Sequence, residues 1–313
     1  MSRVVDPDYP KKKENEELKD KLIQEYQGEQ VKESQFPTEE VDLPSKGYPY
    51  PKDNPLSSGK IEMKYMTAKE EDILTNSNFI KKGTVIDKVL RSLIVTPINY
   101  NELLIGDKNA VLYAARVLGY GKDYEAEVED PETGDKQKVT IDLSQIKNKE
   151  IDEKDYIPGE NKFEFTLPTS KVKVCFKLLT HNDEKNIENM SKALKKQGKP
   201  SAEITTRLKH VILSINGDDD KKSIYDFVDN KLLAIDSAAF RKEVVRIMPD
   251  LDTKFTFYSE SSDKEYTMDI PIGIQFFWPG TWNQVHSVWP DILSSIFWKK
   301  LFIYWSLWYA CAI

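Results

Sequence analysis

Two short stretches of the chain alternate between apolar and charged side chains, and each is followed by a threonine. In residues 61–65 the apolar positions are Ile61, Met63 and Tyr65. This two-residue period is typical of a strand with one buried face. Residues 172–176, with the sequence VKVCF, carry a similar run. We therefore expect one strand in each stretch and a helix beginning shortly after it.

Both threonines have an acidic residue three positions later. Thr67 is followed by Glu70, and Thr180 by Asp183. This spacing predicts a capping box, in which the side chains of both residues satisfy unpaired backbone N–H groups at a helix start. The shorter Asp183 is expected to close its box less well. Such a cap contributes about 1 kcal/mol, so these residues mark helix boundaries and are not a catalytic signature.

A second helix is predicted downstream of each capping box, from an apolar stripe at helical spacing. Pro97 must end the first of these helices, and Asn216-Gly217 is a typical end for the second. The stripe positions are Asn78 or Phe79, Val85, Val89 and Leu93 in the first helix, and Ile204, Leu208, Val211 and Ile212 in the second.

A ten-residue sequence then occurs twice, as NELLIGDKNA at residues 101–110 and as NKLLAIDSAA at residues 230–239. Asp107 and Asp236 stand where the N-cap of a following helix is expected. Each of these two ten-residue boxes is preceded by a Leu-Pro-Ser or Leu-Pro-Thr sequence (43–45 and 167–169), an alternating run and a capping threonine, in that order. The shared order of these landmarks indicates an internal duplication. The alternative is that helix caps recur in an ordinary domain. The duplication predicts that residues 43–143 and 167–270 superpose.

Each box is followed by two alternating runs that flank a polar turn, the pattern of a β-hairpin. The runs are 124–130 with 136–143, and 254–260 with 264–272. The predicted fold class is α+β, mainly helical with short antiparallel hairpins, in two pseudo-repeated helix-hairpin halves. The expected divisions are a disordered charged arm (1–40), a first repeat unit (41–143), a polar linker (144–162), a second repeat unit (163–279) and an aromatic C-terminal tail (280–313).

Composition and charge narrow the functional classes. A net charge of -7 argues against a broad basic surface for nucleic acid. The 2 cysteines provide neither a disulfide framework nor a four-thiolate zinc site. The three histidines lie far apart in the sequence, and no nucleotide-binding or hydrolase motif is present. We therefore expect no catalytic, cofactor-binding or metal-binding residues, and no enzymatic activity. The N-terminus lacks the features of a secretory signal.

All 6 tryptophans lie between residue 278 and the end of the chain. Residues 301–313 are apolar but span only about 20 Å as a helix, less than the ~30 Å hydrocarbon core of a membrane. Three interpretations remain open: a partner-binding helix, a segment at a membrane interface, or a change of reading frame. For the first three aromatic residues, simple core packing is a further alternative. The candidate partner-binding residues are Phe276, Phe277, Trp278, Trp282, Trp289, Trp298, Trp305 and Trp308.

Four motifs together resemble the baseplate hub assembly proteins of T-even-like contractile-tailed bacteriophages. They are LPSKGYPY (43–50), PLSSGKIEMKYMTAKEEDILTN (55–76), LLIGDKNAVLYAARVLGYG (103–121) and IPIGIQFFWP (270–279). The resemblance covers most of residues 41–279. Some relatives carry cysteine pairs resembling zinc knuckles at the hairpin turns. Residues 130–134, DPETG, have that shape without thiols, which implies a hairpin stabilised by packing and not by metal.

The resemblance implies a non-enzymatic, chaperone-like factor in assembly of the tail baseplate hub, acting on other hub proteins in the host cytoplasm. One alternative is a structural hub subunit that stays in the virion tail baseplate. A second, not favoured, is a protein that contacts a membrane interface through its Trp-rich end. The sequence leaves the oligomeric state open.

Overall fold

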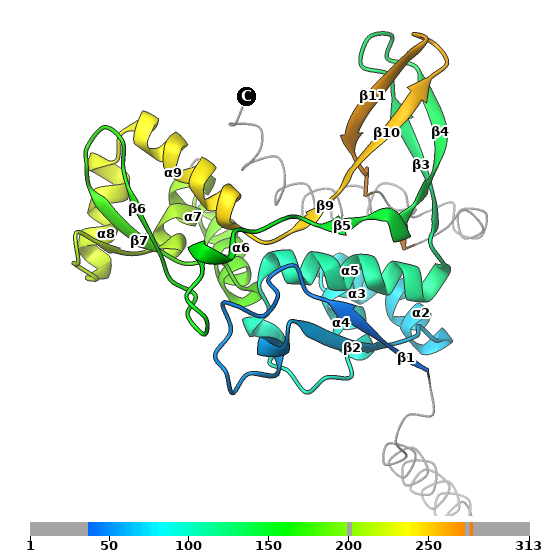
Figure 1. Cartoon of the computed structure of the whole chain (residues 1–313), viewed down its shortest axis with the longest axis horizontal. Helices are drawn as coiled ribbons and strands as arrows, with labels where there is room; N and C mark the ends of the chain where they lie inside the picture. Colours follow the sequence, from blue (N-terminus) through cyan, green and yellow to red (C-terminus); the bar gives the residue numbers. More distant parts are fainter. Residues whose placement is uncertain (1–36, 199–201, 273–275, 278–313) are drawn as a thin grey trace, which may run out of the picture. The chain divides into compact units, whose positions relative to one another are not determined.

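The computed structural model describes residues 37–198, 202–272 and 276–277. The described residues from Thr38 onward form one compact unit. The described residues fold into helices joined to short antiparallel strand pairs (Figure 1), which confirms the α+β class. Residues 1–36 of the predicted arm lie outside the described part, whereas Thr38–Asp42 form a strand. Residues 37–40 of the predicted arm are thus described, and residues 38–40 belong to this strand.

The first half combines a two-stranded sheet with four helices. Strands β1 and β2 are antiparallel, with Val41 opposite Ile61, and α5 packs against β1. Phe79 does not extend α4 as predicted, because Gly83, with a φ of 64°, separates it from that helix. The elements are β1 (Thr38–Asp42), η2 (Pro55–Ser58), β2 (Lys60–Lys64), α2 (Ala68–Thr75), α3 (Ser77–Lys81), α4 (Val85–Leu93), η3 (Tyr100–Glu102) and α5 (Ile105–Tyr120).

The second half contains a three-stranded sheet in the order β6-β7-β8 and four further helices. The predicted helix through Ile212 to Asn216 is wrong in its second part, since the helix ends at Val211 and β8 follows. Ile212 pairs with Phe176 in β7, so tertiary pairing overrides the helical pattern. The elements are β6 (Phe163–Thr166), β7 (Lys173–Phe176), α6 (His181–Lys196), α7 (Glu203–Val211), β8 (Ile212–Ile215), α8 (Lys221–Asp226), η6 (Phe227–Lys231) and α9 (Ala234–Ile247).

Both predicted hairpins are confirmed. Strand β3 (Asp123–Glu129) pairs with β4 (Lys136–Asp142), and β10 (Lys254–Ser259) pairs with β11 (Lys264–Asp269). Figure 1 shows the two hairpins side by side. Their bases are joined by a short ladder between β5 (Lys147–Asn148) and β9 (Leu251–Asp252).

Residues 144–162, predicted as a linker, are closely packed against the rest of the chain. Lys149 donates its Nζ hydrogen bonds to the carbonyls of Val245, Arg246 and Met248 at 2.6, 3.1 and 3.0 Å, which satisfies the C-terminal end of α9. Tyr156 is buried in the core. This segment also includes most of η4 (Leu143–Gln145) and all of η5 (Glu153–Asp155).

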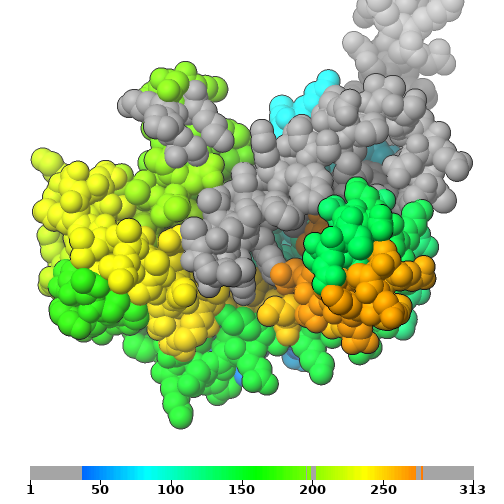
Figure 2. Space-filling view, turned by 90° about the horizontal axis from the view of Figure 1, so that it is seen from above, coloured from blue at the N-terminus to red at the C-terminus, as the bar shows by residue number. Residues whose placement is uncertain are grey.

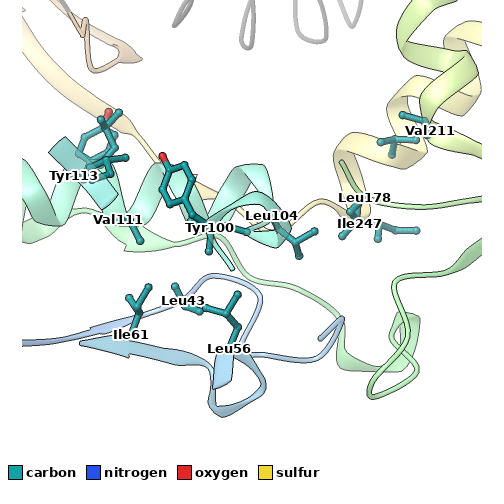
Figure 3. Close-up of a cluster of buried hydrophobic side chains, with 14 of the residues drawn as sticks. Leu43, Leu56, Ile61, Tyr100, Leu104, Val111, Tyr113, Leu178, Val211 and Ile247 are labelled. Carbon is teal, nitrogen blue, oxygen red and sulfur yellow. The ribbon is translucent and has the colours of Figure 1, made fainter. Parts of the chain in front are cut away.

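One continuous cluster of buried hydrophobic side chains joins the two halves (Figure 3). Leu43, Ile61 and Leu104 come from the first half, while Leu178 and Ile247 come from the second. The predicted repeat units therefore share a core. Whether residues 43–143 and 167–270 superpose stays a prediction.

Candidate functional site

The two repeated boxes place a buried aspartate in the first turn of a long helix. The prediction that Asp107 and Asp236 are N-caps is wrong, because the N-cap residues of α5 and α9 are Leu104 and Leu233. Each aspartate is the third residue of its helix, where the backbone N–H groups give a favourable positive potential. Both carboxylates accept hydrogen bonds from a distant loop of their own half.

Asp107 holds the Leu-Pro-Ser loop that begins at Leu43. Its Oδ1 accepts from the Ser45 N–H at 3.0 Å, and its Oδ2 accepts from the Tyr50 hydroxyl at 2.6 Å. The Tyr50 oxygen in turn accepts from the Leu104 N–H at 2.9 Å, at the start of the same helix. Burial favours the neutral acid and raises the pKa of Asp107 to about 6, against the opposing effect of these hydrogen bonds.

Asp236 holds the corresponding Leu-Pro-Thr loop of the second half. Its two oxygens accept from the N–H groups of Thr169 and Ser170 at 2.8 and 2.9 Å. Burial disfavours the charged form here too, but the hydrogen bonds from Ser170 and Thr169 outweigh it and lower the pKa of Asp236. Both boxes therefore use their aspartate to tie a loop from more than 60 residues upstream.

The predicted capping residues lie at two helix starts. In α2 the Thr67 N–H donates to Oε2 of Glu70 at 3.0 Å. In α6 the Thr180 N–H donates to Oδ2 of Asp183 at 3.0 Å, and the Asp183 N–H donates back to the Thr180 hydroxyl at 3.3 Å. The shorter acid thus reaches the cap as well as the longer one.

A lysine that the sequence pattern did not predict forms an ion pair with the acid of each capping box. Lys64 Nζ lies 3.0 Å from Oε1 of Glu70, and Lys177 Nζ lies 2.7 Å from Oδ1 of Asp183. Each lysine stands six residues before its acid, at or just after the end of the preceding strand. In both halves, therefore, a lysine at the end of the preceding strand or directly after it forms an ion pair with the capping acid.

A cluster of charged and aromatic side chains fills the junction between α4, α5 and α6. Lys108 Nζ lies 2.7 Å from Oδ1 of Asp87 and 3.3 Å from Nδ1 of His181. The Tyr100 hydroxyl donates to the same Asp87 oxygen at 3.1 Å. Burial lowers the pKa of His181 to about 4, and the nearby Lys108 charge adds to this effect. These contacts describe a structural network in which each group has a partner within the chain.

The tips of the two hairpins meet at Asp130. Its Oδ1 accepts from the N–H groups of Glu132 and Thr133 at 2.7 and 3.0 Å. Its Oδ2 accepts from three hydroxyls on the other hairpin: those of Ser259, of Ser261 at 3.2 Å and of Ser262 at 2.5 Å. In Figure 2 the orange atoms of the β10-β11 hairpin lie against the green atoms of β3 and β4.

The turn at residues 130–134, which resembles a zinc knuckle without its thiols, is therefore joined to the β10-β11 hairpin by hydrogen bonds. Burial opposes ionisation of Asp130, but the hydroxyls of Ser259 and Ser262 and the two N–H groups outweigh it and hold the pKa well below its usual range. Among the described residues, no three His, Cys, Asp or Glu side chains are grouped so that they could hold a metal ion.

The first two candidate anchors are packed inside the chain. Phe276 and Phe277 are 0% and 1% exposed. The Phe276 ring makes edge contacts with Tyr113 and Tyr124, at centroid distances of 5.2 and 5.3 Å. These two rings occupy the core and present no surface to a partner. The six tryptophans, Trp278, Trp282, Trp289, Trp298, Trp305 and Trp308, lie outside the described residues.

Within residues 37–198 and 202–272, no helix is long and apolar enough to cross a bilayer. A search of the curated proteins and a search of the solved structures each found no match. A family model described as T4 bacteriophage base plate protein matches residues 36–278. This match spans both halves, both hairpins and the two buried phenylalanines. The chain therefore belongs to the family of T4 bacteriophage base plate proteins.

Proposed function

We propose that this protein is a non-enzymatic factor in assembly of the tail baseplate hub and acts by binding other hub proteins. Membership of a phage base plate family indicates a structural or assembly role in the tail. The observation that carries the proposal is the extent of the match, which includes every described residue of the shared core. The polar clusters support it, because the carboxylate oxygens of Asp107, Asp130 and Asp236 accept hydrogen bonds that hold loops in place.

The partner-binding residues are proposed to lie in the aromatic end, since Phe276 and Phe277 are committed to the core. Large aromatic side chains dominate the energetics of protein interfaces, and tryptophan is the most enriched among them. The candidates are Trp278 and the five tryptophans of the tail at residues 280–313, namely Trp282, Trp289, Trp298, Trp305 and Trp308.

Co-expression of the full chain with each hub protein, followed by size-exclusion chromatography, tests the proposal. We expect a stable complex with at least one hub protein. Replacing the five tail tryptophans by serine in the full-length chain is expected to abolish that complex while leaving the thermal unfolding of the body unchanged. Failure to bind any hub protein would refute the assembly role. A complex that survives the five substitutions would refute only the assignment of the anchors.

The alternative within the same family role is a hub subunit retained in the finished particle. Quantitative mass spectrometry of purified virions separates the two. An assembly factor that leaves the particle gives few or no peptides relative to known tail proteins, whereas a subunit gives stoichiometric amounts. We propose the first outcome.

A further inference from the structure

The start of α5 is covered by the second half of the same chain. The Ile105 N–H donates to the Leu179 carbonyl at 3.1 Å, and the His181 N–H donates to the Leu103 carbonyl at 2.8 Å. Leu104 and Thr180 form an antiparallel bridge between these two bonds. The residues before α5 thus pair, like a short strand, with the segment that leads from β7 into α6.

A second segment completes this cover. Gly106 lies directly under Pro249, so close that an added Cβ would be 1.7 Å from the Pro249 carbonyl oxygen. Asn109 Nδ2 donates to Oδ1 of Asp250 at 3.0 Å. As a result Leu104 and Ile105 are only 2% and 8% exposed.

The equivalent start of α9 has no such cover. Aligning the boxes places Leu233 at the position of Leu104 and Ile235 at that of Gly106. Leu233 is 45% exposed and Ile235 is 64% exposed. Within the part of the chain that the structure describes, no hydrogen bond uses the Leu232 carbonyl or the Ala234 N–H. These two groups correspond to the Leu103 carbonyl and the Ile105 N–H, which are both bonded.

An arrangement of stacked repeats normally ends in a unit whose outer face is polar, because the last hydrophobic face would otherwise stay in water. The α9 end lacks this protection. It exposes Leu233 and Ile235 together with an unpaired carbonyl and an unpaired N–H. At α5 the second half bonds the corresponding carbonyl and N–H and buries Leu104, the counterpart of Leu233. This end is therefore built to receive one more segment of the same kind.

The first half carries a segment of that kind. By the order of landmarks, Met66, Thr67 and Ala68 correspond to Leu179, Thr180 and His181. Ala68 is exposed, whereas His181 is buried at the α5 junction. Across the residues with assigned positions, neither the Met66 carbonyl nor the Ala68 N–H takes part in a hydrogen bond.

We infer that a second copy of this chain docks head to tail, with its Met66–Ala68 segment pairing with Leu232–Ala234 at the free end of α9. The Ala234 N–H would donate to the Met66 carbonyl of the other copy, and the Ala68 N–H of that copy would donate to the Leu232 carbonyl. Such a contact joins different surfaces on the two partners, so it builds a ring if the rotation closes and a filament if it does not.

One difference sets how closely the copies approach. Ile235 replaces Gly106, so the partner backbone cannot come as near as Pro249 does within the chain. The Ile235 side chain fills that space instead and becomes the apolar centre of the contact. Replacing it with a charged residue should therefore weaken docking.

Proline substitutions test the paired N–H groups without disturbing the helices. Ala68 and Ala234 are the first residues of α2 and α9, where proline is tolerated because the N–H has no partner inside the helix. The preceding residues, Thr67 and Leu233, are already extended, as proline requires. Lys221, the exposed first residue of α8, offers a matched control, since it too follows an extended N-cap residue.

Sedimentation equilibrium of the full-length chain over a wide concentration range provides the measurement. We expect the wild type and Lys221→Pro to self-associate equally. Ala68→Pro and Ala234→Pro should each weaken association by about tenfold, the effect of losing one backbone hydrogen bond. Ile235→Asp should weaken it further, and circular dichroism should show all variants folded.

Cross-linking of mixed heavy-isotope and light chains gives an independent readout. An amine-reactive linker should join the exposed Lys231 of one copy to the exposed Lys69 of another. A chain that stays monomeric, or an association that is unaffected by Ile235→Asp and Ala234→Pro, would overturn the inference. If only the tail tryptophan substitutions abolish association, the occupant is the aromatic end and the docking mode is likewise refuted. Neither result bears on hub binding.

Discussion

Asp107 and Asp236 occupy the same place in two similar sequences and make the same kind of contact, yet their acidities move in opposite directions. Asp107 has its pKa raised to about 6, whereas the pKa of Asp236 is lowered. The first lies beneath the other half of the chain, close to Asp250, and receives only one backbone N–H. The second receives two. A repeated motif can thus specify the hydrogen bonds between an aspartate and a distant loop, while the surroundings of the aspartate determine the direction in which its pKa shifts.

The two halves differ most in packing at the preceding position, which is Gly106 in the first half and Ile235 in the second. Gly106→Ala should lower the free energy of unfolding by about 3 kcal/mol or more, because the new Cβ would clash with the Pro249 carbonyl. Urea denaturation measures this change. Ile235→Ala, at an exposed site, is the matched control and should cost under about 1 kcal/mol. An equal loss of stability at both positions would mean that Pro249 does not pack closely against the start of α5.

Removing the aspartates should produce the next largest effect. Asp107→Ala leaves the buried Ser45 N–H and Tyr50 hydroxyl without their acceptor, so we expect a loss of roughly 2–3 kcal/mol in stability. Asp236→Ala should also destabilise the fold by releasing the Thr169–Ser170 loop. Hydrogen exchange should show local opening at residues 43–50 in the first variant and at 167–171 in the second. If either variant opened both loops, the two aspartates would not hold their loops independently of each other.

The pH dependence of stability should distinguish the two sites. A raised folded-state pKa gives a contribution that is complete below the unfolded pKa and is lost as pH rises through the folded value. Asp107 should therefore reduce stability by on the order of 2 kcal/mol between pH 4 and pH 7. Asp107→Asn should remove this decline. Asp236 has the opposite sign: its stabilisation is complete above the unfolded pKa near 4 and is lost as pH falls.

Thermal or urea titrations of wild type, Asp107→Asn and Asp236→Asn across this range measure both effects. Asp236→Asn should reduce the pH dependence of the free energy of unfolding only at acid pH, below the unfolded-state pKa near 4. A wild-type profile in which Asp107→Asn leaves the slope between pH 4 and 7 unchanged would contradict the raised pKa.

The smallest effects concern the two capping boxes. Thr67→Ala and Thr180→Ala should each lower the free energy of unfolding by about 1 kcal/mol, since each removes the threonine hydroxyl of a capping box and leaves only the backbone N–H contact to the acid. Equal losses would indicate that Asp183 serves as well as Glu70. Serine at either position is the conservative control, because it retains the hydroxyl. A loss at Thr180 well above that at Thr67 would show that the box also supports the α5 junction.

Local patterns explain which parts of the fold were predictable. The two hairpins and the start of α2 follow from alternation and cap spacing within a few residues, and both are as predicted. Strand β8 was missed because Ile212 is apolar in either a helix or a strand, and only its pairing with Phe176 decides. Long-range partners left no local signal: Lys149 at the end of α9 and the serines around Asp130 lie about a hundred residues from their contacts.

The sequence also predicts the wrong position for Asp107 and Asp236, for a related reason. An acid before a run of helical residues is a sound indication of a helix start, but it does not reveal whether the side chain turns back to its own helix or reaches outward. The doubled Leu-Pro-Ser/Thr sequence was the available clue. The Leu-Pro-Ser sequence at Leu43 and the Leu-Pro-Thr sequence at Leu167 each mark the loop that the aspartate of the same half binds.

The packing of Phe276 has a consequence for the order in which the protein can fold during synthesis. This ring closes over Tyr113 and Tyr124, and the Tyr124 hydroxyl donates to the carbonyl of Pro271, 147 residues later in the chain, at 2.8 Å. The first half therefore leaves the ribosome with an open hydrophobic face that it cannot seal by itself. Nascent chains that stop short of residue 276 should be prone to aggregation and to chaperone capture, and only chains extended past this residue can reach the native core.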